Sequence, residues 1–192
     1  MNQWEAYNRV VGNVPNSIVV HTLNDFVTRR SASLDLGAGN LRDSKFLLGQ
    51  GFTKVVAVDS SKKSLAFLTE GIELHFAPIE TFMPEKNTFD FVLSCNTLFY
   101  LTPEQIADIF QNVLVGLRSG GVFACNVLGK EDDWVVQGQQ VSSFSEETLM
   151  ALATGFDVLG TGEGKNRGQA LDSLGVLGRK YWHQLSIVAQ KP

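Results

Sequence analysis

The stretch LDLGAGNLRDS, residues 34–44, has the form of a turn between a β-strand and an α-helix. Its glycines, Gly37 and Gly39, begin the G-x-G-x-x-G pattern of dinucleotide-binding turns. An acidic residue two positions before the first glycine, here Asp35, is typical of a G-x-G-x-G turn that binds another adenosine cofactor. The third glycine is absent from both patterns, and Leu41 stands in its place in the second. The stretch therefore predicts a ligand-binding strand–turn–helix unit and leaves its cofactor open.

The bulk composition is that of an ordinary globular domain. The chain has 192 residues, of which 44% are hydrophobic and 19% are charged, far from the composition of disordered proteins. Its formal net charge is −4, whereas domains that bind DNA or RNA usually carry a concentrated basic face. We therefore expect a single domain that does not bind nucleic acid.

The sequence gives no sign of a membrane or secreted location. No apolar run approaches the ~20 residues of a transmembrane helix, and the first residues, MNQWEAYNRVV, lack the basic and apolar regions of a secretory signal. Cys95 and Cys125 stand in apolar, strand-like stretches without metal-ligand spacing, so we expect reduced thiols and no metal. These features predict a cytoplasmic protein without a membrane partner.

Strands and helices alternate along most of the chain. Apolar segments typical of strands occupy 31–36, 54–60, 72–78, 89–96 and 122–129. Thr102 and Pro103 are typical of a helix N-terminus, and apolar residues follow them at helical spacing. A shorter helix is predicted over 61–71. Continuously apolar strands that alternate with helices predict a parallel sheet covered on both faces, which is a doubly wound α/β fold.

The last 40 residues have a different pattern. A helix capped by Ser145 is followed by two strand-like segments, 156–163 and 180–191. The connection between them, 164–179, is rich in glycine and too irregular to predict a regular helix. Strands joined without a crossover helix are usually antiparallel, so we expect a hairpin that closes one edge of the sheet.

The turn at Gly37 fits a cofactor without phosphates better than a dinucleotide. A dinucleotide requires glycines, because its pyrophosphate must approach backbone amides at a helix N-terminus. S-adenosylmethionine has no phosphate, and a short turn can bind its aminoacyl end through backbone groups, so Leu41 is tolerable. Asp35 can accept hydrogen bonds from the turn or, through water, from the ammonium group. Arg42 can attract the carboxylate.

A second acidic residue supports an adenosine ligand. Asp59 ends the second predicted strand, 20 residues after Gly39. A carboxylate at this point can accept hydrogen bonds from both ribose hydroxyls, because it offers acceptors alone. The alternative for Asp35 and Asp59 is a structural role in turns and helix caps.

Two long stretches resemble class I S-adenosylmethionine-dependent methyltransferases. LDLGAGNLRDSKFLLGQGFTKVVAVDSS, from Leu34, resembles their first two motifs, and 89–127 resembles their fourth strand, following helix and fifth strand. The last twelve residues resemble their antiparallel final strand. Within this class, the first stretch is most similar to the small tellurite-resistance-like group, in which glycine is usual at the position of Leu41.

The resemblance implies a seven-stranded, mostly parallel, Rossmann-like sheet of order 3-2-1-4-5-7-6, with the last strand antiparallel. It also implies S-adenosylmethionine as the cofactor. The expected organisation is a single domain over 1–192, with an N-terminal helical cap at 1–30, a cofactor-binding core at 31–130, and substrate-side elements with a closing hairpin at 131–192. Within the cap, Trp4 and Tyr7 could form a lid over the cofactor or pack an N-terminal helix.

The resemblance further implies roles for individual residues of the cofactor site. Gly37, Ala38 and Gly39 would pass beneath the methionine end of the cofactor. Asp59 would hold its ribose, and Ser60 would flank its adenine.

Other positions of the implied site agree less closely with the family. Ser94 and Asn96, at the end of the fourth strand, would lie near the sulfonium and the substrate. Pro78 occupies a position where many members have an acid that binds the adenine amine. Glu80 could replace that acid, and Ile79 could pack against the adenine ring.

Candidates for the acceptor side follow the later strands. His183 could act as a general base, and Tyr100 could act at the reacting group. Trp134 and Arg167 could bind the substrate. Packing or surface solvation is the alternative for each of these residues.

The sequence thus predicts in-line methyl transfer from S-adenosylmethionine to a small-molecule acceptor, with the protein supplying alignment and exclusion of water. No G-x-S-x-G motif or other dedicated nucleophile is evident. One alternative is a methyltransferase-fold protein that binds the cofactor or a partner without turnover. A less favoured one is a nicotinamide-dependent oxidoreductase. We expect a monomer or a weak homodimer.

Overall fold

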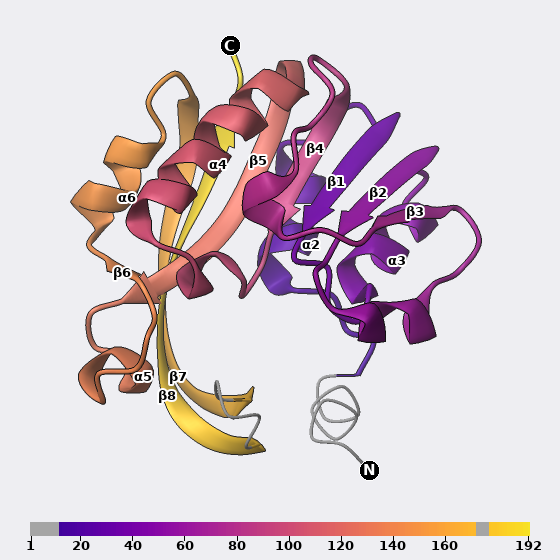
Figure 1. Cartoon of the computed structure of the whole chain (residues 1–192). Helices are drawn as coiled ribbons and strands as arrows, with labels where there is room; N and C mark the ends of the chain where they lie inside the picture. Colours follow the sequence, from indigo (N-terminus) through magenta and orange to yellow (C-terminus); the bar gives the residue numbers. More distant parts are fainter. Residues whose placement is uncertain (1–11, 172–176) are drawn as a thin grey trace.

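The computed structural model describes residues 12–171 and 177–192 (Figure 1). Trp4 and Tyr7, for which a lid was considered, lie outside the described residues. No helix among the described residues is long and apolar enough to cross a membrane.

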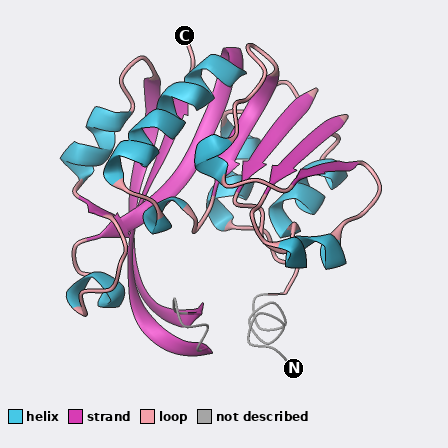
Figure 2. Cartoon of the chain, viewed as in Figure 1, coloured by secondary structure: helices cyan, strands magenta, loops and turns pink. Residues whose placement is uncertain are grey.

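A single mixed sheet forms the centre of the molecule (Figure 2). Its main strands are β1 (Ala32–Leu36), β2 (Lys54–Val58), β3 (Ile72–His75), β4 (Phe89–Ser94), β5 (Leu117–Gly129), β7 (Asp157–Leu171) and β8 (Leu177–Gln190). They lie in the order β3-β2-β1-β4-β5-β8-β7, and β8 is antiparallel to both β5 and β7. The predicted order is confirmed. An additional two-residue strand, β6 (Ser143–Phe144), pairs with β5.

Helices lie on both faces of this sheet, as Figure 1 shows. The α-helices are α2 (Ser17–Asp25), α3 (Arg42–Gly49), α4 (Pro103–Gly116), α5 (Asp133–Val136) and α6 (Glu146–Leu152). Short 3₁₀ turns occupy η1 (Lys62–Phe67), η2 (Ile79–Thr81) and η3 (Leu98–Tyr100). The helix predicted over 61–71 is therefore only the 3₁₀ segment η1. Ser64 is its one buried residue, so it buries no apolar stripe that would stabilise an α-helix.

Alternate residues of each parallel strand contribute to two separate cores. Along β2, Val56 and Val58 pack in the cluster that contains the apolar residues of α4. Val55 and Ala57 pack in the cluster that contains those of α2 and α3. Because successive side chains of a strand point to opposite faces, this division is the direct result of uninterrupted apolar strands.

Helix α4 begins where the sequence predicts it. The Thr102 hydroxyl accepts a hydrogen bond from the backbone N–H of Gln105, and the Gln105 side chain accepts one from the backbone N–H of Thr102. Pro103 occupies the first helical position, where its missing N–H is not needed. This cap fixes the course of the chain after β4.

The C-terminal hairpin is longer than the sequence predicts. The strands pair from Asp157 opposite Gln190 to Leu171 opposite Leu177, so most of the glycine-rich connection at 164–179 is regular strand. β8 pairs with β5 only as far as Gln184. We call 165–171 with 177–183 the hairpin arm, which Figure 1 shows curving away beyond the sheet.

Candidate cofactor site

A cavity of about 550 Å³ lies at the carboxyl ends of the first four strands. This is the edge at which open α/β sheets bind ligands. The lining residues follow β1, β2, the segment after β3, and β4, together with one residue that precedes α2: Asn16, Gly37, Ala38, Gly39, Asn40, Arg42, Asp43, Asp59, Ser60, Ser61, Pro78, Ile79, Glu80, Cys95, Asn96, Thr97, Tyr100 and Leu101. Most of the predicted cofactor-binding residues are therefore placed around one cavity.

The glycine turn after β1 is tightly packed on one side and open on the other. Gly37 has a φ of 81°, and a Cβ at this position would lie 2.2 Å from Oγ1 of Thr97. Gly39 has a φ of 53°, with no protein atom within 4 Å of where its Cβ would be. The backbone N–H groups of Gly37 and Ala38 both donate to the carbonyl oxygen of Val58. The turn is thus fixed by its neighbours and leaves space in front of Gly39.

Leu41 adopts a backbone conformation that is typical of glycine. Its φ is 61° and its ψ is 20°, in the left-handed region that glycine adopts most easily. Its side chain is fully buried in the core cluster that includes Leu23 and Leu47. The side chain does not line the cavity, so the departure from the glycine pattern leaves the cofactor space open.

Asp35 lies beneath the turn instead of lining the cavity. It is 3% exposed, and its Oδ2 atom accepts a hydrogen bond of 2.6 Å from the Ser44 hydroxyl. Burial raises the pKa of Asp35 to about 7, and the nearby carboxylates of Asp43 and Asp59 contribute in the same direction. The direct partner of this carboxyl group is therefore Ser44.

Asn16 joins the start of α3 to the cavity. Its backbone N–H and its side-chain Nδ2 donate to the two oxygens of Asp43, at 2.7 and 2.5 Å. Its Oδ1 atom accepts a hydrogen bond of 2.8 Å from the guanidinium of Arg42. Arg42 thus lines the cavity, as expected, but it also holds Asn16. Sequence reasoning missed this contact, because Asn16 belongs to no motif and lies 27 positions from Asp43.

Asp59 joins the second strand to the glycine turn. Its Oδ2 atom accepts a hydrogen bond of 2.7 Å from the backbone N–H of Gly39, and its Oδ1 atom accepts one of 2.8 Å from that of Ser61. Each carboxylate oxygen has a second lone pair. The structural role considered for Asp59 is therefore present, and it leaves the carboxylate able to accept further hydrogen bonds.

Not every predicted residue lies at the cavity. Ser94 is fully buried behind it and donates to the carbonyl oxygen of Leu36. Trp134 is 4% exposed and packs in an aromatic cluster with Phe99 and Trp182. This side chain belongs to a core cluster and is absent from the cavity lining, and its contact with substrate stays a prediction.

His183 and Arg167 lie away from the cavity. Consecutive residues of a strand point to opposite faces, and Gln184, not His183, contacts Asn96. His183 accepts the backbone N–H of Glu131 at Nδ1 and contacts Glu163 at Nε2, beside a second cavity. Arg167 is exposed on the arm. Neither side chain lines the cavity, and the roles of His183 as a base and of Arg167 as a substrate ligand stay predictions.

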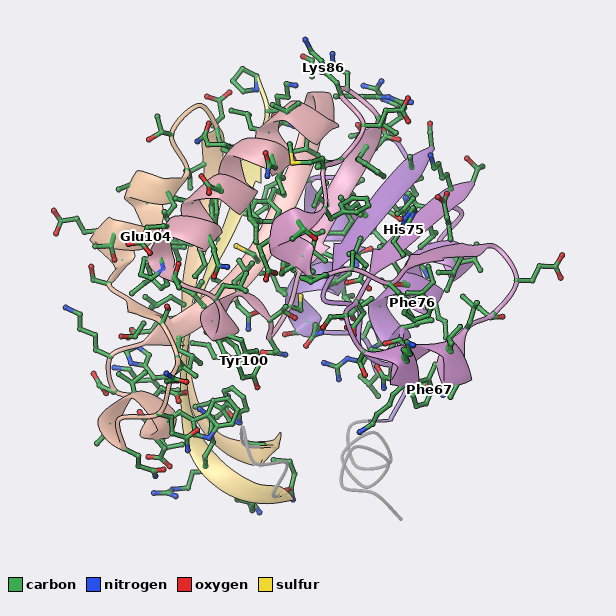
Figure 3. The ribbon with its side chains drawn as sticks, viewed as in Figure 1. Phe67, His75, Phe76, Lys86, Tyr100 and Glu104 are labelled. Atoms are coloured by element: carbon green, nitrogen blue, oxygen red, sulfur yellow. The ribbon has the colours of Figure 1, made fainter. Side chains whose placement is uncertain are left out.

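Tyr100 is the predicted acceptor-side residue that does line the cavity. Figure 3 shows it on the side of the body that faces the curved hairpin. Its side chain is 50% exposed, and its ring lies 4.6 Å from that of Phe99 and 6.1 Å from that of Trp134. Across the described part of the chain, no group of three or more His, Cys, Asp or Glu side chains could hold a metal ion.

The sequence of this cavity-forming region matches a known family. Residues 34–121, from β1 into β5, match the family described as methyltransferase domain. This match covers just under half of the chain, which over these residues is similar to a methyltransferase domain. A comparison of the chain with curated proteins found no match.

Several solved structures share the fold of this chain. TehB from Haemophilus influenzae is 20% identical with a TM-score of 0.77, over 99% of this chain and 67% of that one. The 1,6-didemethyltoxoflavin-N1-methyltransferase of Burkholderia thailandensis is 20% identical with a TM-score of 0.70, over 97% and 82%. An S-adenosylmethionine-dependent methyltransferase of Mesorhizobium loti is 16% identical with a TM-score of 0.67, over 92% and 99%. Sequence identities of 16–20% show that the fold is shared and nothing beyond the fold.

Proposed function

We propose that this protein is a methyltransferase, and that it transfers the methyl group of S-adenosylmethionine to a small-molecule acceptor bound in the cavity at the strand ends. One observation carries the proposal. The cavity joins an open glycine turn with nearby carboxylates on one side to an uncharged wall after β4 on the other. The first side fits a cationic adenosine cofactor, and the second leaves room for an acceptor.

The charge around the turn suits the aminoacyl end of the cofactor. S-adenosylmethionine has a positive ammonium group and a positive sulfonium, and the carboxylates of Asp43 and Asp59 line the cavity with Asp35 just beneath. Opposite charges within one cavity attract each other, most strongly where water is partly excluded. The open space at Gly39 lets a ligand approach the backbone. Arg42 lines the cavity beside the turn and can attract the ligand's carboxylate.

The adenosine end fits the residues that follow β2 and β3. Asp59 keeps lone pairs that can accept hydrogen bonds from ribose hydroxyls. Ser60 lies beside it in the lining. Ile79 presents an apolar side chain to the adenine ring, and Glu80 can accept a hydrogen bond from the adenine amine. Pro78 lines the same part of the cavity.

The protein's own contribution is alignment and exclusion of water. The chemistry that S-adenosylmethionine supplies when bound is an activated methyl group: a lone pair of the acceptor bonds to the methyl carbon, and the electrons of the broken carbon–sulfur bond stay on sulfur. A proton released by the acceptor goes to water. Cys95 lines the cavity, but burial raises the pKa of its thiol well above the usual value, so it remains protonated and is not a nucleophile.

A small acceptor agrees with the size and charge of the site. Cavities of about 300–1,000 Å³ are typical of small-molecule sites, and this one of about 550 Å³ must hold the cofactor and the acceptor together. The net charge of −4 and the acidic lining oppose a polyanion such as nucleic acid.

Calorimetric titration of the full chain with S-adenosylhomocysteine and then with NAD tests this proposal. We expect S-adenosylhomocysteine to bind and NAD not to bind, because the carboxylates repel its pyrophosphate. The variant Asp59→Asn should bind S-adenosylhomocysteine about tenfold more weakly. Asp157→Asn, at the exposed start of β7, is the matched control and should bind like the wild type. Tighter binding of NAD, or equal affinity in the two variants, would overturn the proposal.

A further inference from the structure

The cavity is divided into a charged part and an uncharged part. Among the described residues, the charged ones that line it, Arg42, Asp43, Asp59 and Glu80, follow β1, β2 or β3. The lining that follows β4 has no charged side chain and consists of Cys95, Asn96, Thr97, Tyr100 and Leu101. We call the surface formed by Asn96, Tyr100 and Leu101 the uncharged wall. On the proposed function, the cofactor occupies the charged part, and this wall faces the acceptor.

A single backbone donor sets the orientation of the amide groups at this wall. The backbone N–H of Asn96 lies 2.7 Å from the side-chain oxygen of Asn126. Because a peptide N–H can only donate, the oxygen of the Asn126 amide must face it, and its nitrogen must point to the Asn96 side chain. The amide nitrogen of Asn126 therefore donates a hydrogen bond of 2.8 Å to the side-chain oxygen of Asn96. Gln184 donates to the same oxygen at 2.6 Å.

A second set of contacts leads to the same orientation from the other side of the cavity. The carboxylate of Asp43 can only accept, so the amide nitrogen of Asn16 faces it. The Asn16 oxygen then faces Asn96, whose Nδ2 atom lies 3.3 Å away. With its oxygen held by Asn126 and Gln184, Asn96 turns its –NH₂ group toward the cavity. That group carries two N–H donors, of which the contact with Asn16 uses one.

Next to this donor the uncharged wall has a rigid aromatic surface. The Tyr100 ring is half exposed at the cavity and is supported from behind by Phe99 and Trp134. Trp134 is fixed in turn, because the Lys180 ammonium lies 4.0 Å from its ring and 3.9 Å from that of Trp182. Lys180 is itself paired with the buried carboxylate of Asp132. An aromatic face held in this way suits stacking against a planar ligand.

We propose that the acceptor is a planar, uncharged aromatic molecule. Its ring stacks on Tyr100, and a carbonyl oxygen or ring nitrogen beside the methylated atom accepts a hydrogen bond from the Asn96 –NH₂ group. An anionic acceptor would find no cation among the described residues of the uncharged wall, and it would face the carboxylates of Asp43 and Asp59. Arg42, on the charged part, is already paired with Asn16 and Asp43, and on the proposed function it serves the cofactor carboxylate. Asn96 is therefore a specificity-determining residue for the acceptor.

The test measures binding to the chain saturated with S-adenosylhomocysteine, so that it does not depend on turnover. The probes are 4-hydroxyquinoline, its 2-carboxylate derivative, which adds only an anionic group, and selenite as an inorganic oxyanion. We expect 4-hydroxyquinoline to bind about tenfold more tightly than either anion. Equal or tighter binding of the carboxylate or of selenite, or no binding of 4-hydroxyquinoline, would overturn the proposal.

Two matched variants test the role of Asn96. Asn96→Asp keeps the oxygen that accepts from Asn126 and Gln184 and replaces the donor group with an acceptor. Asn87→Asp makes the same change at another residue of positive φ (52°, against 56° for Asn96), at the opposite end of β4, and keeps the oxygen that binds Lys191. We expect Asn96→Asp to weaken 4-hydroxyquinoline binding about tenfold and Asn87→Asp to leave it unchanged.

The affinity for S-adenosylhomocysteine separates this inference from the proposed function. We expect both variants to bind S-adenosylhomocysteine like the wild type. A parallel loss of that affinity in Asn96→Asp would show that Asn96 serves the cofactor and would overturn its assignment to the acceptor. If the wild-type chain does not bind S-adenosylhomocysteine, the proposed function itself fails. If the wild-type chain binds S-adenosylhomocysteine but the two variants bind 4-hydroxyquinoline with equal affinity, only the assignment of Asn96 to the acceptor fails.

Discussion

The side chain of Thr97 lies directly against the Cα atom of Gly37, and its hydroxyl contacts the Gly37 carbonyl oxygen at 3.3 Å. The segment after β4 therefore rests on the turn after β1, and this contact joins the acceptor side of the cavity to the cofactor side. A side chain at position 37 would force the two segments apart.

Gly37→Ala should accordingly destabilise the protein by about 2–4 kcal/mol, from the overlap with Thr97 and from a left-handed backbone. Gly120→Ala is the matched control, because Gly120 has a similar φ of 76° but open space around it, and should cost only about 1 kcal/mol. Urea unfolding measures both. Removing the obstacle in Gly37→Ala/Thr97→Gly should recover part of the loss, and no recovery would contradict this explanation.

Substitutions at Leu41 should show an unusual order of stability, in which the glycine variant is more stable than the alanine variant. Leu41→Ala loses the buried side chain, at about 2–5 kcal/mol, and keeps the strained left-handed backbone. Leu41→Gly loses the same side chain but relieves about 1 kcal/mol of that strain. We therefore expect the glycine variant to unfold at a higher urea concentration than the alanine variant. The opposite order would show that the backbone at Leu41 stores no strain.

The Asp35 carboxyl group should make stability depend on pH. Its pKa is raised from 3.8 to about 7 in the folded chain, so the folded state holds a proton that the unfolded state has released. The resulting stabilisation is complete below about pH 4 and is lost as the pH rises toward 7. Asp35→Asn has no such loss, so its stability relative to the wild type should increase between pH 5 and pH 8 by about 2–3 kcal/mol. Urea unfolding at the two pH values measures this, and a constant difference would contradict it.

Lys180 should stabilise the folded protein, because it neutralises the buried carboxylate of Asp132. Lys180→Met keeps an apolar chain between Trp134 and Trp182 but leaves Asp132, which is fully buried, without its ion-pair partner. We expect a loss of about 2–5 kcal/mol. The double variant Lys180→Met/Asp132→Asn should recover much of it, as measured by unfolding followed through tryptophan fluorescence. If the double variant is no more stable than the single one, the charge of Asp132 is not the cause.

Local patterns in the sequence predict the core of the fold well. The uninterrupted apolar strands give a sheet that is covered on both faces, and the spacing of Thr102 and Gln105 gives a helix cap that forms as expected. The glycine turn and Asp59 are placed correctly at one cavity, because the carboxyl ends of adjacent parallel strands must meet at one edge.

Contacts between distant segments account for most of what the sequence did not reveal. Asn96 meets Asn16 and Gln184, which are 80 and 88 positions away, and no local pattern marks such a meeting. The face that His183 occupies was not predicted, because the face of a strand residue depends on the pairing register, and a shift of one position reverses it. The glycines of β7 indicated a loop, but the paired strand β8 supplies the hydrogen bonds that keep this segment extended.

The amide groups around Asn96 inherit their direction from a peptide N–H at one end and from a carboxylate at the other. If residue 126 were aspartate, one of its oxygens would still accept that N–H, and the other would require a donor from residue 96. A half-turn of the Asn96 amide to supply that donor would set its oxygen against the Asn16 oxygen and its –NH₂ group against that of Gln184. A change of one atom at residue 126 is therefore opposed by both neighbours of Asn96, and the polarity that this residue shows to an acceptor is inherited as a unit.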